Sequence, residues 1–378
     1  MSVNPMSKNL SGKTRKAVIA ALDMSSADFD VEPLLDELEL LLGNLGVTSV
    51  GRIIQKRDHP DAGCFLGIGK AEEAALFCAS VGAGLIVCNG QLAPGQRATL
   101  SKITKCEVWD RAFVIMKIFE RRARSQEAKL QVERALCAYE MPYLKGLGRA
   151  MSRLGGGIGT RGPGETEFER HRRKLERRLR DISGKLRVIR DRRRLSRERR
   201  AKERFPVISL AGYTNSGKST LLRRLSGDET LIAEDRLFST LDTFIRGVRL
   251  PSGRTILVAD TVGFIRDLPH SLIDAFRATL EEICQSSLIL LVLDAGAPDC
   301  LETFRVVTTT LGDIGAGEVR RIVLLNKTDT CREEDVVQLR ERIAGEEDVV
   351  LPVSAVDGSG VDSLLRYLDE YFQQEEKQ

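Results

Sequence analysis

The sequence has few aromatic residues and lacks a long apolar run. Aromatic side chains make up 5% of the 378 residues, and there is a single tryptophan. The longest strongly apolar run, 288–293, is six residues long, whereas a membrane-spanning helix needs about 20. A basic segment at 8–16 is followed by a short apolar stretch that runs into Asp23, which is not a signal-peptide pattern. The chain is therefore not expected to span a membrane.

The cysteines lack the pattern of a metal site or of a disulfide framework. None of the eight forms a CxxC pair, and none clusters with the three histidines. Scattered cysteines in apolar surroundings are typical of buried, reduced thiols. We therefore expect a reducing compartment, the cytoplasm, with peripheral association at a membrane surface kept as an alternative.

Length and element pattern predict an α/β protein of three parts with boundaries at 1–110, 111–204 and 205–378. In the first part, compact apolar runs alternate with helical patterns, which indicates a parallel sheet covered by helices. The expected strands are 16–23, 49–57, 84–90 and 107–111, and the expected helices are 31–46, 70–83 and 94–104.

The second part, 111–204, predicts a long antiparallel helical hairpin. Residues 113–144 read as one long helix, a glycine-rich loop follows at 155–165, and a basic helix comes next. In that helix the apolar side chains are spaced 4, 3, 4 and 3 residues apart, the a/d pattern of a helix–helix seam. They are Leu175, Leu179, Ile182, Leu186 and Ile189.

Positive charge is concentrated in this part. Residues 170–204 hold 18 Lys and Arg against five Asp and Glu, a net of +13, which leaves −9 for the rest of a chain whose total is +4. Such a density on one helix predicts a polyanion partner, and RNA phosphates fit it. Arg149, Arg153 and Arg161 are candidates for contacts from the loop. Few aromatic residues interleave, so base stacking is not indicated.

The third part carries a phosphate-binding motif between a strand and a helix. GYTNSGKST matches G-x-x-x-x-G-K-[ST], in which backbone amides wrap the phosphates. Lys218 would reach the β- and γ-phosphates, and Ser219 would place a hydroxyl on Mg²⁺. The predicted phosphate-binding residues are Gly212, Tyr213, Thr214, Asn215, Ser216, Gly217, Lys218, Ser219 and Thr220.

A second motif, DTVG, closes the next apolar strand and predicts γ-phosphate sensing. Asp260 would hold Mg²⁺ through a water, and the Gly263 amide would meet the γ-phosphate, with Thr261 and Val262 between them. Between the two motifs, Thr240 and Thr243 are both candidates for a switch threonine that reaches Mg²⁺. The nucleotide-binding switch residues predicted there are Phe238, Ser239, Thr240, Leu241 and Asp242.

The third and fourth motifs select the base. In NKTD, Asp329 would accept from N1–H and the N2 amine of guanine; adenine lacks this amine and would leave the carboxylate unpaired. Asn326 would support the base edge, the Lys327 stem would cover the ring, and Thr328 completes the motif. Ser354 and Ala355 follow the last strand, where the Ala355 amide would meet guanine O6. Four motifs in this order predict a GTPase, with Lys218, Asp260 and Gly263 as catalytic residues.

The chain resembles the HflX GTPases, a translation-factor-class family related to the Obg group. The resemblance covers nearly all of 16–372 and is carried by the phosphate loop and by segments 119–135, 157–169, 237–242 and 260–276. It implies an N-terminal α/β domain with a helical hairpin and a G domain with a six-stranded, mostly parallel sheet. It also implies binding to the large ribosomal subunit and ribosome splitting under stress. Thr240, rather than Thr243, would be the switch threonine, a catalytic residue and a Mg²⁺ ligand beside Ser219.

The sequence departs from the family pattern in two places, and alternative functions stay open. His171 stands where the family usually has Asp, and the chain is expected to lack the C-terminal domain of many relatives. We expect a monomer without a DNA partner, in which residues 149–204 contact ribosomal RNA. The alternatives are a ribosome-assembly GTPase and an ATP-dependent RNA-remodelling protein that uses a second nucleotide site in the N-terminal part, where LGIGK (66–70) is weak evidence.

Two residues raise the question of catalysis. Phe264 follows DTVG where Ras-like proteins place a water-orienting Gln. Either Phe264 is a core residue and another group acts, or the free enzyme is slow and its partner orders the site; we favour the second interpretation. Asn215 resembles an asparagine that binds K⁺ beside the β- and γ-phosphates in some GTPases, and a turn-forming role is the alternative.

Overall fold

The computed structural model describes residues 15–24, 31–152, 163–202, 205–228, 238, 244–266, 280, 282–345 and 349–375. The chain divides into two compact units. The first unit is Met1–Ile118 with Leu136–Glu176, and the second unit is Phe119–Ala135 with Arg177–Gln378. Within the described residues, no helix is long and apolar enough to cross a membrane. The three domain boundaries expected from the sequence remain predictions.

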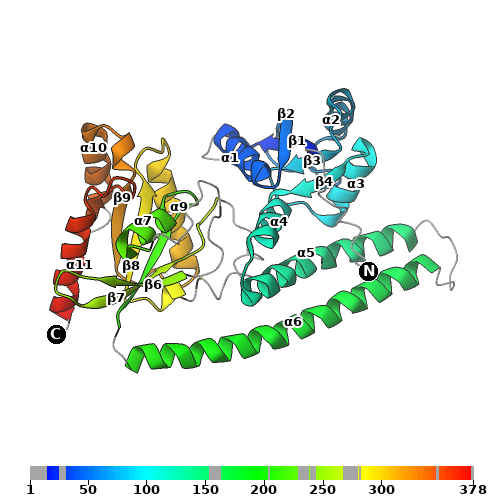
Figure 1. The fold of residues 1–378 in the computed structure, drawn as a ribbon. Coiled ribbons are helices and arrows are strands. Elements are labelled where there is room, and N and C mark those ends of the chain that lie inside the picture. The colour runs from blue at the N-terminus through cyan, green and yellow to red at the C-terminus, as the bar shows by residue number, and fades with distance from the viewer. Residues whose placement is uncertain are drawn as a thin grey trace. The chain divides into compact units, whose positions relative to one another are not determined.

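The first unit contains a four-stranded parallel sheet in the order β2-β1-β3-β4 (Figure 1). Its strands are β1 (Arg15–Asp23), β2 (Val47–Lys56), β3 (Leu85–Cys88) and β4 (Glu107–Asp110). Its covering helices are α1 (Val31–Asn44), α2 (Ile68–Val81) and α3 (Pro94–Thr104). The predicted alternation of strands and helices is confirmed.

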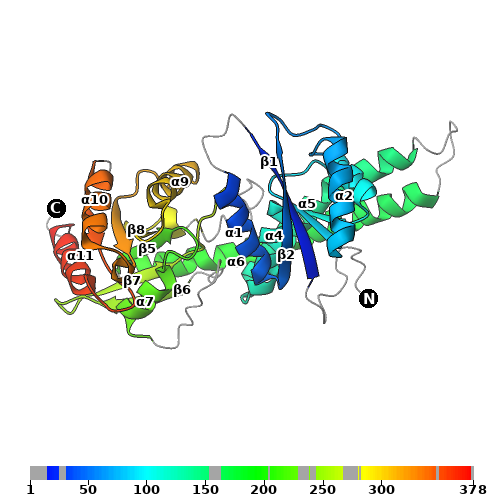
Figure 2. The same cartoon turned by 90° about the horizontal axis from the view of Figure 1, so that it is seen from above.

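Helices cover both faces of this sheet because its central strands are apolar on both sides. In β3 all four residues are buried, as in a strand sealed on both faces. The α2 and α3 side chains pack with Val18, Ala20 and Ile86 from one face in one apolar cluster. Figure 2 shows α1 and α2 on opposite sides of β1 and β2.

The helix expected at 113–144 is two helices, so that prediction was wrong. α4 (Arg111–Arg122) ends before Ser125, and α5 (Gln126–Ser152) begins after it. The Ser125 hydroxyl oxygen accepts from the Ala128 amide at 3.1 Å, the bond of an N-cap residue. The apolar periodicity runs through both helices, so it carries no sign of the break.

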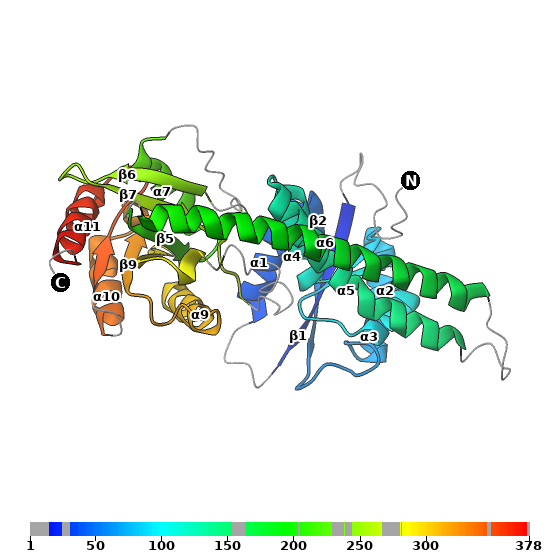
Figure 3. The same ribbon diagram turned by 90° about the horizontal axis from the view of Figure 1, so that it is seen from below.

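α6 (Pro163–Lys202) lies beside α5 with opposite direction (Figures 1 and 3). In the second unit, Arg178 pairs with Glu133 at 2.6 Å and Arg193 pairs with Glu127 at 3.2 Å, so the two helices run antiparallel. Of the five apolar residues predicted to form the helix–helix seam, Ile182 is fully buried and the other four are half-buried. The helical hairpin of the predicted fold is confirmed.

The second unit is built on a six-stranded sheet in the order β10-β9-β8-β5-β7-β6, in which only the pairing of β6 with β7 is antiparallel. Its strands are β5 (Val207–Gly212), β6 (Phe244–Arg249), β7 (Thr255–Asp260), β8 (Leu288–Asp294), β9 (Arg321–Asn326) and β10 (Val350–Pro352). Its helices include α7 (Lys218–Ser226), α9 (Cys300–Asp313), α10 (Glu333–Ala344) and α11 (Val361–Glu375). The predicted mixed, mostly parallel sheet is confirmed.

The helices of this unit pack on the faces of the sheet. α7 and α11 share one apolar cluster with alternate residues of the central strands, among them Ile208, Leu210 and Leu290. Figure 3 shows α7 and α9 on opposite sides of β5. β5 pairs with β7 on one side and β8 on the other, and the chain order changes direction there. Open α/β sheets bind ligands at such a point, outside the carboxyl ends of the strands.

Candidate nucleotide-binding site

The loop between β5 and α7 has the backbone that a phosphate cradle needs. Gly217 has φ +93°, and a Cβ there would lie 2.2 Å from Asn326 Nδ2, so only glycine fits. Asn215 has φ +63° and is exposed at the tip of the loop. The loop therefore places the N-terminus of α7, where the first amides of a helix lack intrahelical partners, at the edge of the sheet.

Lys218 begins α7 and is buried in the loop. Its ammonium donates to the carbonyl oxygens of Gly212 at 3.0 Å and Tyr213 at 2.6 Å. Burial lowers the pKa of Lys218 to about 8, an effect that the nearby Asp260 carboxylate partly offsets. A phosphate beside the ammonium would favour its charged form, since an opposite charge within a few ångströms does so.

Ser219 and Asp260 meet as the two sequence motifs predicted. The Ser219 hydroxyl donates to Asp260 Oδ2 at 2.6 Å across 41 positions of sequence. A hydroxyl and a carboxylate are the oxygen donors that Mg²⁺ prefers, so these residues fit the ion. Two further loop hydroxyls, Thr214 Oγ1 and Ser216 Oγ, are buried and have no hydrogen-bond partner among the described residues. Buried unsatisfied hydroxyls are costly, which indicates a polar ligand at this loop.

DTVG lies directly against the phosphate loop. The Phe264 amide donates to Gly212 O at 3.0 Å, and the Thr214 amide donates to Phe264 O at 2.8 Å. A Cβ on Gly263 would lie 2.9 Å from Thr214 Cα, so glycine is needed for this approach. The Phe264 side chain is 2% exposed. Phe264 is therefore a core residue, and its side chain offers no hydrogen bond to a water.

Asn326 connects the base-recognition motifs to the phosphate loop. It is 1% exposed, and its Nδ2 donates to Ser216 O at 2.8 Å. Its Oδ1 accepts from the Ala355 amide at 3.0 Å. The predicted contact of that amide with guanine O6 stays a prediction.

The charged residues of NKTD have partners on neighbouring loops. Lys327 Nζ lies 2.7 Å from Asp294 Oδ2 at the end of β8, which fixes the lysine stem above the edge of the sheet. Asp329 is exposed, and its Oδ1 accepts from the Ser354 hydroxyl at 2.7 Å. The carboxylate expected to read guanine is thus oriented by the serine of the fourth motif.

The remaining described members of the motifs have mainly local roles. Thr261 donates to Leu210 O at 2.6 Å, and Thr328 donates to Val353 O at 3.0 Å. Val262 is buried, and Thr220 is half-buried in α7. These contacts hold the loops, and contacts of the four residues with a nucleotide stay predictions.

Part of the predicted site lies outside the described residues. This holds for Ser239, Thr240, Leu241 and Asp242, for the alternative Thr243, and for Arg153 and Arg161. The side chain of Arg149 lies outside them too, although its backbone belongs to α5.

Phe238 is described, and it packs in the second unit. Its ring is 2% exposed and meets Phe119 of α4 edge-on, with centroids 4.6 Å apart. Its backbone has φ +58°. The structure therefore gives Phe238 a packing contact, while its predicted contact with the nucleotide stays a prediction.

Sequence reasoning missed two charged residues at this edge. Arg266 is 8% exposed, pairs with Asp299, and lies 3.1 Å from Glu302, while its amide donates to the Tyr213 hydroxyl at 2.9 Å. Arg224 of α7 donates to Val356 O. Both partners are distant in sequence, so no local pattern marks either arginine.

The chain matches three family models. Those described as the N-terminal and middle regions of a GTP-binding GTPase match residues 32–120 and 122–200. The one described as a 50S ribosome-binding GTPase matches residues 207–327, the span from β5 to NKTD.

Curated relatives match over most of their length. GTPase HflX of Caldanaerobacter subterraneus subsp. tengcongensis is 40% identical over 370 residues, which cover 98% of this chain and 83% of the relative. GTPase HflX of Escherichia coli is 38% identical over 343 residues, with 91% and 80% covered. A solved structure of SsGBP with GDP is similar in fold, with 24% identity, a TM-score of 0.51, and 95% of this chain and 99% of that chain covered.

Proposed function

The chain belongs to the HflX family of GTPases, and we propose that it couples GTP hydrolysis to binding of the large ribosomal subunit and to the splitting or rescue of ribosomes. The observation that carries the ribosomal part is the charge of α6, supported by the match to a 50S ribosome-binding GTPase model. The proposed place of action is the cytoplasm, where ribosomes work.

The proposed roles follow the geometry of the phosphate loop. The amides of 212–219 and the Lys218 ammonium would hold the phosphates, and Ser219, with Thr240, would hold Mg²⁺. Asp260 accepts from Ser219 and would hold the ion's water. Mg²⁺ would neutralise charge that develops on the phosphates. Gly263, packed on Thr214, would present its amide to the γ-phosphate.

Guanine is the proposed base. The Asp329 carboxylate, oriented by Ser354, would accept from N1–H and the N2 amine, and Asn326 would hold the base edge. Lys327, fixed by Asp294, would cover the ring with its stem. An adenine base would leave the carboxylate without donors, which argues against an ATP-using protein at this site.

We propose that catalysis waits for the ribosome. Phe264 cannot orient a water, and its backbone is bonded on both sides to the phosphate loop. A partner that orders the switches and excludes bulk water would supply positioning without a new acid or base. The free protein is then a slow GTPase.

The exposed face of α6 is the proposed contact with ribosomal RNA. Arg170, Arg177, Arg180 and Arg187 are exposed, on a helix whose less exposed stripe is apolar. Repulsion among like charges on one helix is unfavourable without an anion nearby. Neutralising phosphates releases counterions, so binding should weaken steeply as salt rises.

Sedimentation with purified large subunits tests this contact, with GTP-loaded protein at two salt concentrations. Arg177→Glu with Arg180→Glu should weaken binding at least about tenfold and flatten the salt dependence. The matched control reverses two exposed arginines of α10, Arg340→Glu with Arg342→Glu, and should bind as the parent does. If both double variants bound the large subunit equally well, α6 would not be part of the ribosome-binding surface.

A K⁺ ion beside Asn215 is a further part of the proposal. A cation there would stabilise charge between the β- and γ-phosphates, as an arginine finger does. GTP turnover should then be faster in K⁺ than in Na⁺, and Asn215→Ala should remove the difference. If the parent protein turned over GTP at the same rate in K⁺ and in Na⁺, the proposed K⁺ site would be wrong.

A further inference from the structure

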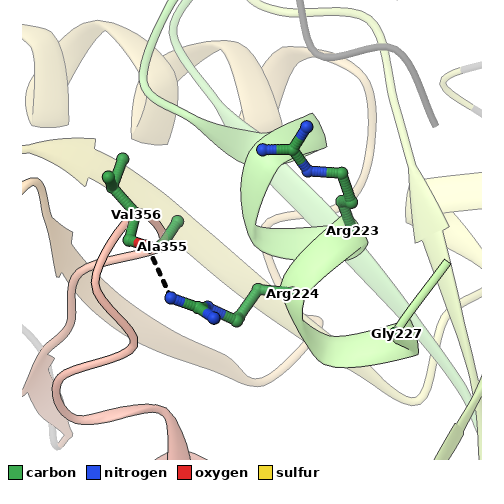
Figure 4. Close-up of a pocket in the computed structure, with 5 residues that line it drawn as sticks. All are labelled: Arg223, Arg224, Gly227, Ala355 and Val356. Carbon is green, nitrogen blue, oxygen red and sulfur yellow. Dashed lines mark hydrogen bonds between the residues drawn. The ribbon is translucent and has the colours of Figure 1, made fainter. Parts of the chain in front are cut away.

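α7 connects the phosphate end of the site to the base end. It begins with Lys218 at the phosphate loop, and Arg224 lies in its last turn. The Arg224 guanidinium donates from Nη2 to the carbonyl oxygen of Val356 at 2.5 Å, across 132 positions of sequence. Figure 4 shows Arg224 reaching from the helix to the loop at Ala355 and Val356.

The loop that carries Ala355 is tied mostly to itself. The Ser354 amide donates to Ser359 O at 2.8 Å, and the Gly358 amide donates to Ser354 O at 2.9 Å. The bond from Arg224 is different because it joins the loop to a helix that also holds the phosphate-binding lysine. Together with the Ala355–Asn326 bond, it fixes the loop from two directions.

The loop is shaped to admit the guanidinium. Gly358 has φ +94°, and a Cβ there would lie 3.2 Å from Arg224 Nη2 and 3.3 Å from its Cζ. The neighbouring carboxylate of Asp357 has a lowered pKa, first because of the Ser359 amide and to a smaller extent because of Arg224. An open cavity of about 480 Å³ lies here, lined by Arg223, Arg224, Gly227, Ala355 and Val356.

We infer that Arg224 is a positioning residue for guanine recognition. Its bond to Val356 O holds the backbone at 355–356, so that the loop's amides meet the O6 edge of the base. The inference rests on the proposed guanine site, and it adds a residue outside the four motifs. Arg224 acts through the loop and touches no atom of the nucleotide in this scheme.

Arg223 supplies a matched control. It carries the same charge, lies one position earlier in the same helix and lines the same cavity. In Figure 4 the hydrogen bond to the loop is drawn from Arg224, and Arg223 extends elsewhere. Arg223→Ala therefore reproduces the loss of charge and of side chain from α7 without removing the bond to Val356.

The test measures the Kd of three nucleoside diphosphates by displacement of a fluorescent GDP analogue. GDP carries the full guanine edge, IDP lacks the N2 amine, and the 2,6-diaminopurine analogue has an amine in place of O6 and lacks the N1 proton. Arg224→Ala should weaken GDP about five- to tenfold, because the loop would lose one hydrogen bond that holds its amides in place for the base. Its preference for GDP over the diaminopurine analogue should shrink by a similar factor.

The same variant should keep the parent's preference for GDP over IDP, because Asp329 reads the N2 amine. Arg224→Lys retains a donor and should recover most of the affinity, and Arg223→Ala should stay within about twofold of the parent. The inference is overturned if Arg224→Ala behaves as Arg223→Ala does, or if GDP and the diaminopurine analogue weaken equally. A parent protein that does not bind GDP would instead overturn the guanine site itself.

Discussion

In the proposed site, base selection depends on Asp329. Asp329→Asn replaces an acceptor by an amide, which loses the charge-assisted bonds to N1–H and the N2 amine. The variant should bind GDP at least about tenfold more weakly, and xanthosine diphosphate, whose C2 oxygen can accept from the amide, more tightly than the parent does. Competition binding with the two nucleotides measures both changes.

Asp335→Asn is the control for this prediction. Asp335 is an exposed carboxylate in the first turn of α10, so its replacement changes the net charge equally without altering NKTD. The control should keep the parent's affinities. If Asp329→Asn preferred GDP over xanthosine diphosphate as strongly as the parent does, another group would read the base.

Burial should make most of the cysteine thiols slow to react with a thiol reagent. Six of the eight free cysteines are buried, while Cys284 and Cys331 are half-buried. Burial raises the pKa of Cys78 and of Cys300 to about 12, so their reactive thiolates are scarce at neutral and mildly alkaline pH. A colorimetric thiol titration at pH 8 should show fast reaction only at Cys284 and Cys331, and all eight groups after denaturation. Fast reaction of most thiols in the native protein would contradict the buried positions.

Residues of the proposed phosphate site were predictable where the chemistry requires a fixed spacing in the sequence. Two motifs at strand ends predicted Lys218, Ser219 and Asp260. In the structure, the Ser219 hydroxyl donates to Asp260 at 2.6 Å. Arg266 and Arg224 were not predictable, because their partners, Asp299 and Val356, come from distant loops. The Phe264 side chain is packed in the core, which fits both interpretations of catalysis, so the choice between another catalytic group and a partner that orders the site stays a prediction.

At the scale of elements, Ser125 separates α4 from α5. Ser125→Ala removes the acceptor for the Ala128 amide, so the free energy of unfolding should fall by about 1 kcal/mol. Ser125→Gly should cost only a few tenths of a kcal/mol, since glycine also suits an N-cap. Urea unfolding of the three proteins measures the difference. Equal losses for both variants would mean that the hydroxyl contributes little there.

This break shows where periodicity stops being informative. Apolar spacing identified the helices of 113–144, since both present apolar faces, but it did not mark the break between them, where Ser125 caps α5. In α6, by contrast, the 4-3-4-3 spacing identified the less exposed stripe, with Ile182 fully buried. Spacing reports which face is covered, and local hydrogen bonding decides where a helix ends.

Across the whole protein, the alternation of strands and helices predicted the parallel sheet of the first part. Sequence order alone does not fix the neighbours of a strand. β5 lies between β8 and β7, an arrangement that depends on packing between segments distant in sequence. The resemblance to HflX GTPases supplied the six strands and the mixed sheet. The motifs then located the site, because each ends a strand at the same edge.

The most direct measurement is GTP turnover by the purified protein, alone and with large ribosomal subunits, at two salt concentrations. With Phe264 unable to orient a water and a strongly basic α6, the basal rate should be low. It should rise strongly with subunits, and the rise should be lost at high salt. A fast basal rate that subunits do not change would contradict the proposal, because the protein would then carry its own catalytic group and the ribosome would not be the activating partner.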